Sequence, residues 1–293
     1  MTATILDGKA LAKEIKQEII ADVEAFGKTH GFVPAIAVAR IGEDPASVSY
    51  AKMIKRNFEG VGMRFSLHVL PELASQVEAN SLIAGLNADD SVQGIMLQEP
   101  IPRGIDVAAV KAALSPEKDV DGVSPINAGR LALAAPFGRP SGVLEYLVPA
   151  TPLGGLELLK RYGVKIEGQK AAVVGRSNIV GKPMAFLLMQ YQATVTICHS
   201  RTADLATACR EADILCAAVG RAKIITADMV KPGAVVIDFG FNRLEGKWVG
   251  DVDFESAKEV ASMITPVPGG TGSMTNVMLM KNVIEAARRQ VAR

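Results

Sequence analysis

The sequence predicts an α/β fold of two lobes, and two features carry this prediction. Strand-like and helix-like segments alternate along the chain, and a stretch rich in proline and glycine interrupts the alternation midway. Strands separated by helices build βαβ units with a mainly parallel sheet. The 293 residues, 49% hydrophobic and 22% charged, can fill the cores of two domains of ordinary size. We therefore expect two α/β lobes with a ligand-binding cleft between them.

The N-terminal lobe is expected over residues 1–146. It begins with an amphipathic helical segment, and a further helix should follow the Asp-Pro pair at 44–45 and run to about residue 61. The remaining expected elements are strands at 34–42, 64–70 and 92–98 and a helix at 73–86. Residues 115–150, rich in proline and glycine, are expected to be a long functional connection between the lobes.

The C-terminal lobe is expected over residues 147–274. Its strands should lie at 170–175, 193–198, 212–220 and 233–242, with helical segments between them. A last strand-like piece, 262–270, runs into a glycine-rich turn and a final helix from about Met274. This order of elements is typical of a Rossmann-type lobe.

Composition excludes several classes of partner. The net charge is +1, with 32 cations spread along the chain against 31 anions, so we expect no binding to nucleic acid or to an anionic membrane. The sequence has no secretory signal at its start and no apolar run of the roughly 20 residues that span a bilayer. Three cysteines without CxxC spacing indicate reduced thiols and a cytoplasmic location. The three histidines lie far apart, so we expect no metal site.

A phosphate-binding turn is expected where the first strand of the C-terminal lobe ends. Gly175 and Gly181 flank a short polar loop, and Pro183 stands at the start of the following helix. Glycines let backbone N–H groups approach a phosphate, and the helix N-terminus adds partial positive charge. Ser177 replaces the second glycine of the common GxGxxG pattern, so an ordinary tight turn is the alternative interpretation.

The next strand favours NADP over NAD. NAD-binding folds place an acidic residue near its end to hold the ribose 2′-hydroxyl. Here Ser200 and Arg201 follow the strand, and no carboxylate occurs before Asp204. Hydroxyl and guanidinium groups suit a 2′-phosphate, and Arg176 could add a second cation. The alternative is a solvated loop that happens to carry an arginine.

Four motifs resemble those of one known family, in the same order along the chain: EKDVDG (117–122), GRSNIVGKPM (175–184), DFGFNR (238–243) and TPVPGG (265–270). They resemble methylenetetrahydrofolate dehydrogenase/methenyltetrahydrofolate cyclohydrolase along essentially the whole chain. The resemblance implies a homodimer with NADP in the Rossmann lobe, a tetrahydrofolate one-carbon substrate in the cleft, and a final helix (about 275–293) that packs back on the N-terminal lobe. Its implied cofactor-binding residues are Gly175, Arg176, Ser177, Ile179, Ser200 and Arg201.

The resemblance also implies a folate site. Tyr50 would pack on the folate, Gln98 would hold a catalytic lysine, and Asp121 would hydrogen-bond the pterin. Gly269 and Gly270 would form a wall of the site. Their ordinary alternatives are a half-buried core tyrosine, an amide at a strand end, a turn aspartate and a β–α turn.

One departure from the family pattern bears on function. The family's lysine stands four residues after its tyrosine, where this sequence has Ile54, and Lys55 points well to one side on a helix. Further departures are Glu99, Ala150, Thr271 and Ser273. We therefore expect NADP-dependent oxidation of 5,10-methylenetetrahydrofolate with a weak or absent cyclohydrolase step. Two alternatives stay open: a fully bifunctional enzyme that uses Lys55 or Glu99, and a non-catalytic folate- or nucleotide-binding paralogue.

Overall fold

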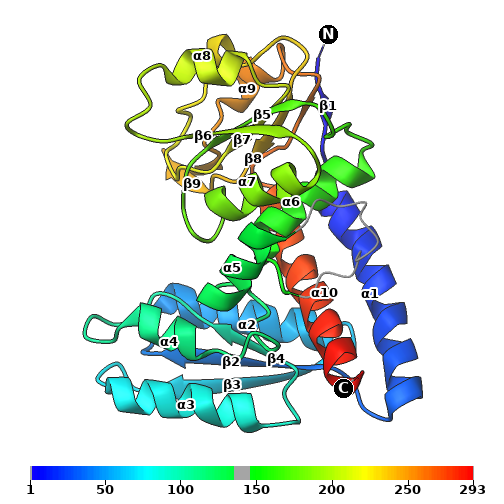
Figure 1. The fold of residues 1–293 in the computed structure, drawn as a ribbon, viewed down its shortest axis with the longest axis vertical. Coiled ribbons are helices and arrows are strands. Elements are labelled where there is room, and N and C mark those ends of the chain that lie inside the picture. Colours follow the sequence, from blue (N-terminus) through cyan, green and yellow to red (C-terminus); the bar gives the residue numbers. More distant parts are fainter. Residues whose placement is uncertain (1, 135–145, 293) are drawn as a thin grey trace. The chain divides into compact units, whose positions relative to one another are not determined.

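The computed structural model describes residues 2–134 and 146–292 and divides into two compact units (Figure 1). The three-stranded unit holds the described residues of Glu14–Arg130, Leu144–Ala150 and Asn276–Arg293. The six-stranded unit holds those of Met1–Lys13, Leu131–Val143 and Thr151–Thr275. Each is considered by itself below.

The three-stranded unit is built on a parallel sheet in the order β3-β2-β4. The central strand β2 (Ala35–Ile41) is buried along its whole length, between β3 (Arg64–Leu70) and β4 (Gly94–Leu97). Helices α2 (Pro45–Glu59) and α3 (Gln76–Ala88) make the crossovers that parallel strands require. The shorter α4 (Val107–Ala113) follows β4. One apolar core joins the sheet to α3 and α4 through Ile83, Ile95 and Val110.

The six-stranded unit has a parallel sheet in the order β1-β11-β8-β7-β5-β6. The strand bounds are β1 Thr4–Ile5, β11 Met263–Ile264, β8 Val235–Asp238, β7 Ile214–Ala217, β5 Lys170–Val174 and β6 Thr194–Cys198. The strand order reverses at β5, because β6 lies on one side of it and β7 on the other. Open α/β sheets bind ligands outside the carboxyl ends of strands at such a point.

The helices of this unit are α7 (Gly181–Gln190), α8 (Leu205–Arg210), α9 (Phe254–Ala257) and the 3₁₀ turn η1 (Ala227–Met229). An antiparallel hairpin, β9 (Asn242–Leu244) and β10 (Lys247–Val249), follows β8. Four helices have described residues in both units: α1 Gly8–His30, α5 Pro125–Leu133, α6 Ala150–Arg161 and α10 Thr271–Val291.

The predicted α/β class with a Rossmann-like lobe is confirmed, and three local expectations are corrected. Residues 115–150 are not simply a connection, because they contain α5; residues 135–145 lie outside the described residues. The strand expected at 233–242 ends at Asp238 and is followed by the β9–β10 hairpin. Strand β1 was not expected, since two residues are too short to show a period. The boundary near residue 146 and the cleft stay predictions.

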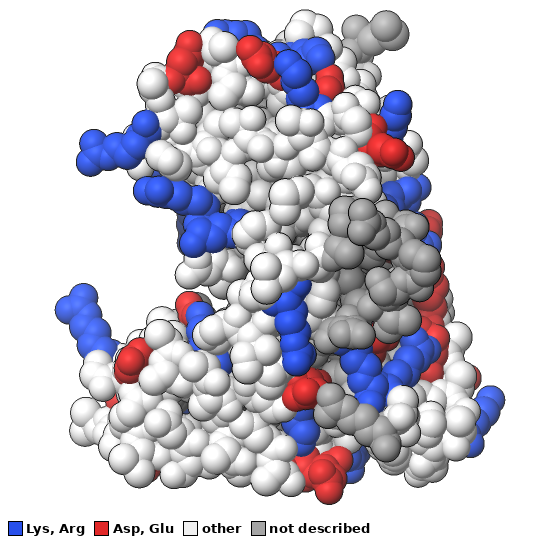
Figure 2. All heavy atoms as spheres, viewed as in Figure 1, with Lys and Arg blue, Asp and Glu red and all other residues white. Residues whose placement is uncertain are grey.

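The surface carries both signs of charge, and Figure 2 shows cationic and anionic side chains on the visible face of each unit. Within the described ranges no helix is long and apolar enough to cross a membrane. The same residues contain no group of three or more His, Cys, Asp or Glu side chains placed to hold a metal ion. Cys198, Cys209 and Cys216 are free thiols and are buried.

Candidate functional site

The turn between β5 and α7 depends on two glycines that approach neighbouring backbone closely. Gly175 has φ +130°, and a Cβ added there would lie 2.1 Å from the carbonyl oxygen of Ala218 at the end of β7. A Cβ on Gly181 would lie 2.3 Å from the carbonyl oxygen of Gly175. The Ser177 hydroxyl accepts hydrogen bonds from the N–H groups of Val180 and Gly181, each at 3.2 Å. The turn therefore presents bare backbone at the start of a ten-residue helix, which is a cradle suited to phosphate.

Two arginines lie on the loops that follow the adjacent strands β5 and β6. Because β5 and β6 are parallel with Val174 opposite Cys198, the loops after both strands emerge at the same edge of the sheet. Arg176 lies on the first loop and Arg201 on the second; both are exposed, and neither has an ion-pair partner in the part of the chain that the structure describes. Two unpaired guanidinium groups at one edge are suited to bind the phosphates of a dinucleotide.

The second loop is held in shape by its own side chains. The His199 N–H donates to the Thr202 hydroxyl at 2.9 Å, and the Arg201 N–H donates to His199 Nδ1 at 3.1 Å. Ser200 and Arg201 are exposed within this turn, and Ile179 is exposed at 47% on the first loop. The residues expected to bind the cofactor thus lie on two neighbouring loops of one unit.

Two buried aspartates join the loops at the same edge of the sheet. Asp238, which ends β8, accepts hydrogen bonds from the N–H groups of Gly240, Asp251 and Val252 at 2.8–3.0 Å. Asp251 accepts from the N–H groups of residues 219–221, directly after the Ala218 that faces Gly175. Burial raises the pKa of Asp238 to about 6, although its three backbone hydrogen bonds oppose that shift. These carboxylates fix the backbone on which the phosphate turn rests.

In the three-stranded unit, helix α2 directs its cations away from its buried face. The Asp44 side chain caps the helix by accepting from the Ser47 N–H at 2.9 Å, and Pro45 occupies the first turn. Ile54 is fully buried in a stripe with Ser47, Ala51 and Phe58. Lys55 is exposed and faces Glu59 at 3.8 Å, so it lies off the buried face as the helical geometry predicts.

Gln98 connects the end of β4 to α2 and carries an unused acceptor. Its Nε2 donates to the carbonyl oxygen of Ser47 at 2.5 Å, and its N–H donates to Ala39 in β2. The side chain is 2% exposed, yet its Oε1 has no hydrogen-bond partner among the described residues. Burying such an oxygen without a donor costs about 1–3 kcal/mol. This amide oxygen can accept a hydrogen bond from a further donor.

Asp121 is buried near other acidic side chains, and this environment disfavours the ionised form of its carboxyl group. Burial and then the neighbouring Asp119 raise the pKa of Asp121 to about 7, with Lys111 opposing the shift and Glu99 adding to it. Burial, with a further contribution from Asp121, raises the pKa of Tyr50 to about 12. Tyr50 therefore lies within electrostatic range of Asp121. Asp119 accepts hydrogen bonds from the N–H groups of Val123 and Ser124 and from Asn127 Nδ2. The Asp121 carboxyl has no such partner among the described residues.

An ion pair that the sequence did not reveal lies beside this cluster. Lys111 Nζ lies 2.5 Å from Glu99 Oε1, which joins α4 to the residue after Gln98. The Lys111 side chain is only 20% exposed and the Glu99 side chain 52%. Both charges act on Asp121. The two partners stand twelve residues apart on different elements, so no helical spacing pointed to their contact.

Comparisons with known proteins identify the family of this arrangement. Residues 6–121 match the family model described as tetrahydrofolate dehydrogenase/cyclohydrolase, catalytic domain, and residues 149–291 match that of the corresponding NAD(P)-binding domain. The chain is 53% identical over 293 residues to a protein of Roseiflexus sp. named bifunctional protein FolD. The aligned region covers 100% of this chain and 99% of that relative. The chain belongs to the tetrahydrofolate dehydrogenase/cyclohydrolase family.

Solved structures of family members agree with the fold. The bifunctional FolD methylenetetrahydrofolate dehydrogenase/cyclohydrolase of Campylobacter jejuni superposes with a TM-score of 0.93 at 43% identity, over 98% of this chain and 99% of that one. A Trypanosoma brucei methylenetetrahydrofolate dehydrogenase-cyclohydrolase, solved with NADP and an inhibitor, superposes at 0.91 with 33% identity over 100% of both chains. The catalytic and NAD(P)-binding models of the family match the two halves in which Tyr50 and Gly175 lie.

The predicted folate residues are divided between the two units. Tyr50, Gln98 and Asp121 belong to the three-stranded unit, whereas Gly269 and Gly270 precede α10 in the six-stranded unit. Gly269 has φ +111°, and its carbonyl oxygen accepts from the Lys9 N–H at 2.9 Å. A role of these glycines in a folate site stays a prediction.

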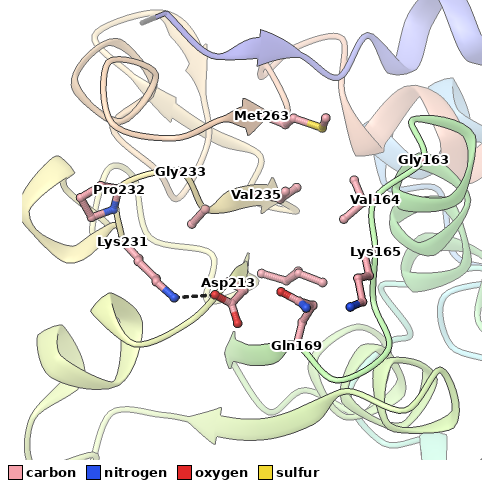
Figure 3. Close-up of a pocket in the computed structure, with 12 residues that line it drawn as sticks. Gly163, Val164, Lys165, Gln169, Asp213, Lys231, Pro232, Gly233, Val235 and Met263 are labelled. Carbon is pink, nitrogen blue, oxygen red and sulfur yellow. Dashed lines mark hydrogen bonds and ion pairs between the residues drawn. The ribbon is translucent and has the colours of Figure 1, made fainter.

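The structure also contains a cavity of about 300 Å³ at the opposite, amino edge of the six-stranded sheet (Figure 3). Val164, Val235 and Met263 line the cavity, together with the Lys231–Asp213 ion pair, in which Nζ lies 2.5 Å from Oδ1. It begins where β7 and β8 start, whereas the phosphate turn follows the end of β5. This cavity is therefore separate from the two loops expected to bind the cofactor.

Proposed function

We propose that this protein oxidises 5,10-methylenetetrahydrofolate with NADP and hydrolyses the methenyl product to 10-formyltetrahydrofolate. The observation that carries the proposal is the intact glycine cradle with its two unpaired arginines, on a chain 53% identical to a bifunctional family member. A dinucleotide cradle without turnover would serve little purpose, which argues against the alternative of a non-catalytic paralogue.

The residues present fit NADP. Gly175 and Gly181 leave room for the pyrophosphate against bare backbone, and Ser200 and Arg201 offer donors to a 2′-phosphate at the end of β6. A family member from Trypanosoma brucei was solved with NADP, which supports the same choice. When bound, NADP accepts the hydride from the one-carbon bridge.

In the oxidation the protein mainly has to align the folate, because the folate nitrogens stabilise the cation that forms. The half-buried ring of Tyr50 offers a surface on which the folate can pack. The free carboxyl of Asp121 can accept hydrogen bonds from the amino and ring N–H groups of a pterin. Neither role requires the lysine that Ile54 replaces.

The hydrolytic step distinguishes two candidate functions. Relatives about 50% identical to this chain carry the name bifunctional, which favours an enzyme with both activities. The fully buried Ile54 and the orphaned Gln98 Oε1 favour a dehydrogenase with weak hydrolysis, because neither Ile54 nor Gln98 can carry a proton. We take the bifunctional enzyme as the proposed function and the dehydrogenase as the second candidate.

A homodimer and a cytoplasmic location belong to the same proposal. The outer side of β3 pairs with no other described strand, and Leu67 and Val69 on β3 are 41% and 42% exposed. An exposed apolar edge strand is suited to pairing with a second copy. The free, buried cysteines fit a reducing compartment.

The experiment is a turnover assay with NADP and 5,10-methylenetetrahydrofolate that records NADPH formation. The proposal expects NADPH to form at a rate that saturates with both substrates, and faster with NADP than with NAD. A purified, folded protein that binds folate and forms no NADPH would favour the non-catalytic paralogue instead.

A further inference from the structure

We propose that the Lys111–Glu99 ion pair, delivered from α4 and the end of β4, is the acid–base group of the hydrolytic step in place of the lysine that α2 lacks. The inference rests on the proposed function, because it assigns residues to the second reaction of that site. It explains how a chain with Ile54 could retain the activity for which its relatives are named.

Among the cations near the predicted folate residues, Lys111 is the one that acts on the site. Lys52 and Lys55 both lie on the exposed face of α2, and Lys55 faces Glu59 at 3.8 Å. Lys111, in contrast, is largely buried, contacts the residue next to Gln98, and acts electrostatically on Asp121. The neighbouring Val110 is fully buried in the core and fixes the helix that presents Lys111.

The cluster around Asp121 explains why a cation is held there. Asp119, Asp121 and Glu99 bring three carboxyl groups into one small region, and the charge of Asp121 also raises the pKa of Tyr50. Lys111 is the cation that opposes the raised pKa of Asp121. An ion pair whose acid and base are in direct contact can supply a proton on one side and take one on the other.

The proposed chemistry balances without a further reactant. Water attacks the methenyl carbon, a carbon–oxygen bond forms, and the carbon–nitrogen bond to N5 breaks. Overall, one proton of the water ends on N5 and the other is released. In the proposed step, Glu99 accepts a proton from the water and Lys111 donates a proton to the leaving nitrogen. The Glu99–Lys111 contact returns both groups to their starting charges by passing a proton between them.

The test supplies methenyltetrahydrofolate directly, without cofactor, to Lys111→Met, Lys111→Arg and Glu99→Gln, with Lys55→Met as the matched control. Positioned acid–base groups contribute about 10²–10⁴-fold, so we expect Lys111→Met to lose at least about tenfold in hydrolysis. NADPH formation from the methylene substrate should fall by a smaller factor than hydrolysis, because Lys111 acts on the oxidation only through the charge of Asp121. Lys111→Arg keeps the charge but cannot release a proton, so it should also lose hydrolysis, as should Glu99→Gln.

Hydrolysis at the wild-type rate in Lys111→Met would overturn the inference, and so would full activity in Lys111→Arg. A wild-type protein that forms NADPH yet hydrolyses no faster than the uncatalysed reaction would overturn it as well, while the dehydrogenase stands. Absence of NADPH formation is the separate outcome that rejects the proposed function. In the Lys111→Met background, Ile54→Lys should restore hydrolysis by giving Gln98 Oε1 its donor, which would show that this variant still folds a competent site.

Discussion

At the scale of single residues, positions 54, 98 and 111 bear on the hydrolytic step. Ile54 is fully buried on α2, and the amide oxygen of Gln98 is left without a donor. The Lys111–Glu99 ion pair presents a lysine from another helix, α4. Sequence reasoning could identify the loss at position 54, because the tyrosine fixes the register of the helix. It could not identify Lys111, whose only signal was the unusual glutamate at position 99 with no partner at helical spacing.

Replacement of Asp121 by asparagine is expected to separate stability from activity. Because the pKa of Asp121 is raised from 3.8 to about 7, the folded chain binds this proton more tightly than the unfolded chain does. The charged carboxylate therefore costs stability above pH 7, and the cost disappears as the pH falls to about 4. At about 1.4 kcal/mol per pKa unit, Asp121→Asn should raise the free energy of unfolding at pH 8 by at least about 1 kcal/mol.

Denaturant unfolding of wild type and Asp121→Asn at pH 8 and pH 4 measures the change in the free energy of unfolding. The stabilisation of the variant should be absent at pH 4. The same variant should lose at least about tenfold in NADPH formation, because an amide replaces the carboxylate that we propose binds the pterin. An Asp121→Asn protein less stable than wild type at pH 8 would mean that the carboxylate is not disfavoured in the folded state.

The preference between the two dinucleotides is expected to depend on Arg201. A charge-assisted hydrogen bond contributes about 1.5–3 kcal/mol, so Arg201→Ser should lower kcat/KM for NADP by roughly 10- to 100-fold. The kcat/KM for NAD should change little, because NAD lacks the 2′-phosphate, and it serves as the internal control. Equal losses with NADP and NAD would assign Arg201 to the shape of the loop instead.

At the scale of elements, the turn between β5 and α7 has the strictest geometry. Gly175 combines a positive φ with a backbone oxygen 2.1 Å from where a Cβ would stand. Gly175→Ala should therefore lower the free energy of unfolding by about 2 kcal/mol or more and weaken NADP binding. Gly85 in α3 has open space around it, so Gly85→Ala should be neutral or stabilising by up to about 1 kcal/mol.

Thermal unfolding of both variants, with NADP titration of the folded protein, measures the contrast. Equal stability of the two alanine variants would contradict the close packing of Gly175 against Ala218.

Elements with a clear period were predictable, and those defined by tertiary contacts were not. The buried run at 34–42 and the alternation at 64–70 correspond to β2 and β3, because side-chain pattern alone decides such strands. The β9–β10 hairpin and α5 were missed; glycine and proline around them concealed three-residue strands and a nine-residue helix. The glycine turn between β5 and α7 was predictable from a local motif, whereas the Asp238 and Asp251 network joins residues far apart in sequence.

At the scale of the whole molecule, the exposed edge of β3 predicts self-association. Leu67 and Val69 on β3 are 41% and 42% exposed, and lysine on such an edge opposes pairing. Val69→Lys should therefore shift the protein from dimer to monomer in analytical ultracentrifugation. Trp248→Lys, at a residue 47% exposed on the β9–β10 hairpin, is the matched surface control and should leave the dimer intact. A wild-type protein that sediments as a monomer at micromolar concentration would remove the dimer from the account.

The most direct test of the account follows the methenyl intermediate during turnover of 5,10-methylenetetrahydrofolate with NADP, in wild type and in Lys111→Met. The account predicts that wild type forms NADPH and that its methenyl species disappears faster than in the uncatalysed reaction. Lys111→Met should still form NADPH but accumulate the methenyl species. Equal methenyl accumulation in both proteins would contradict it.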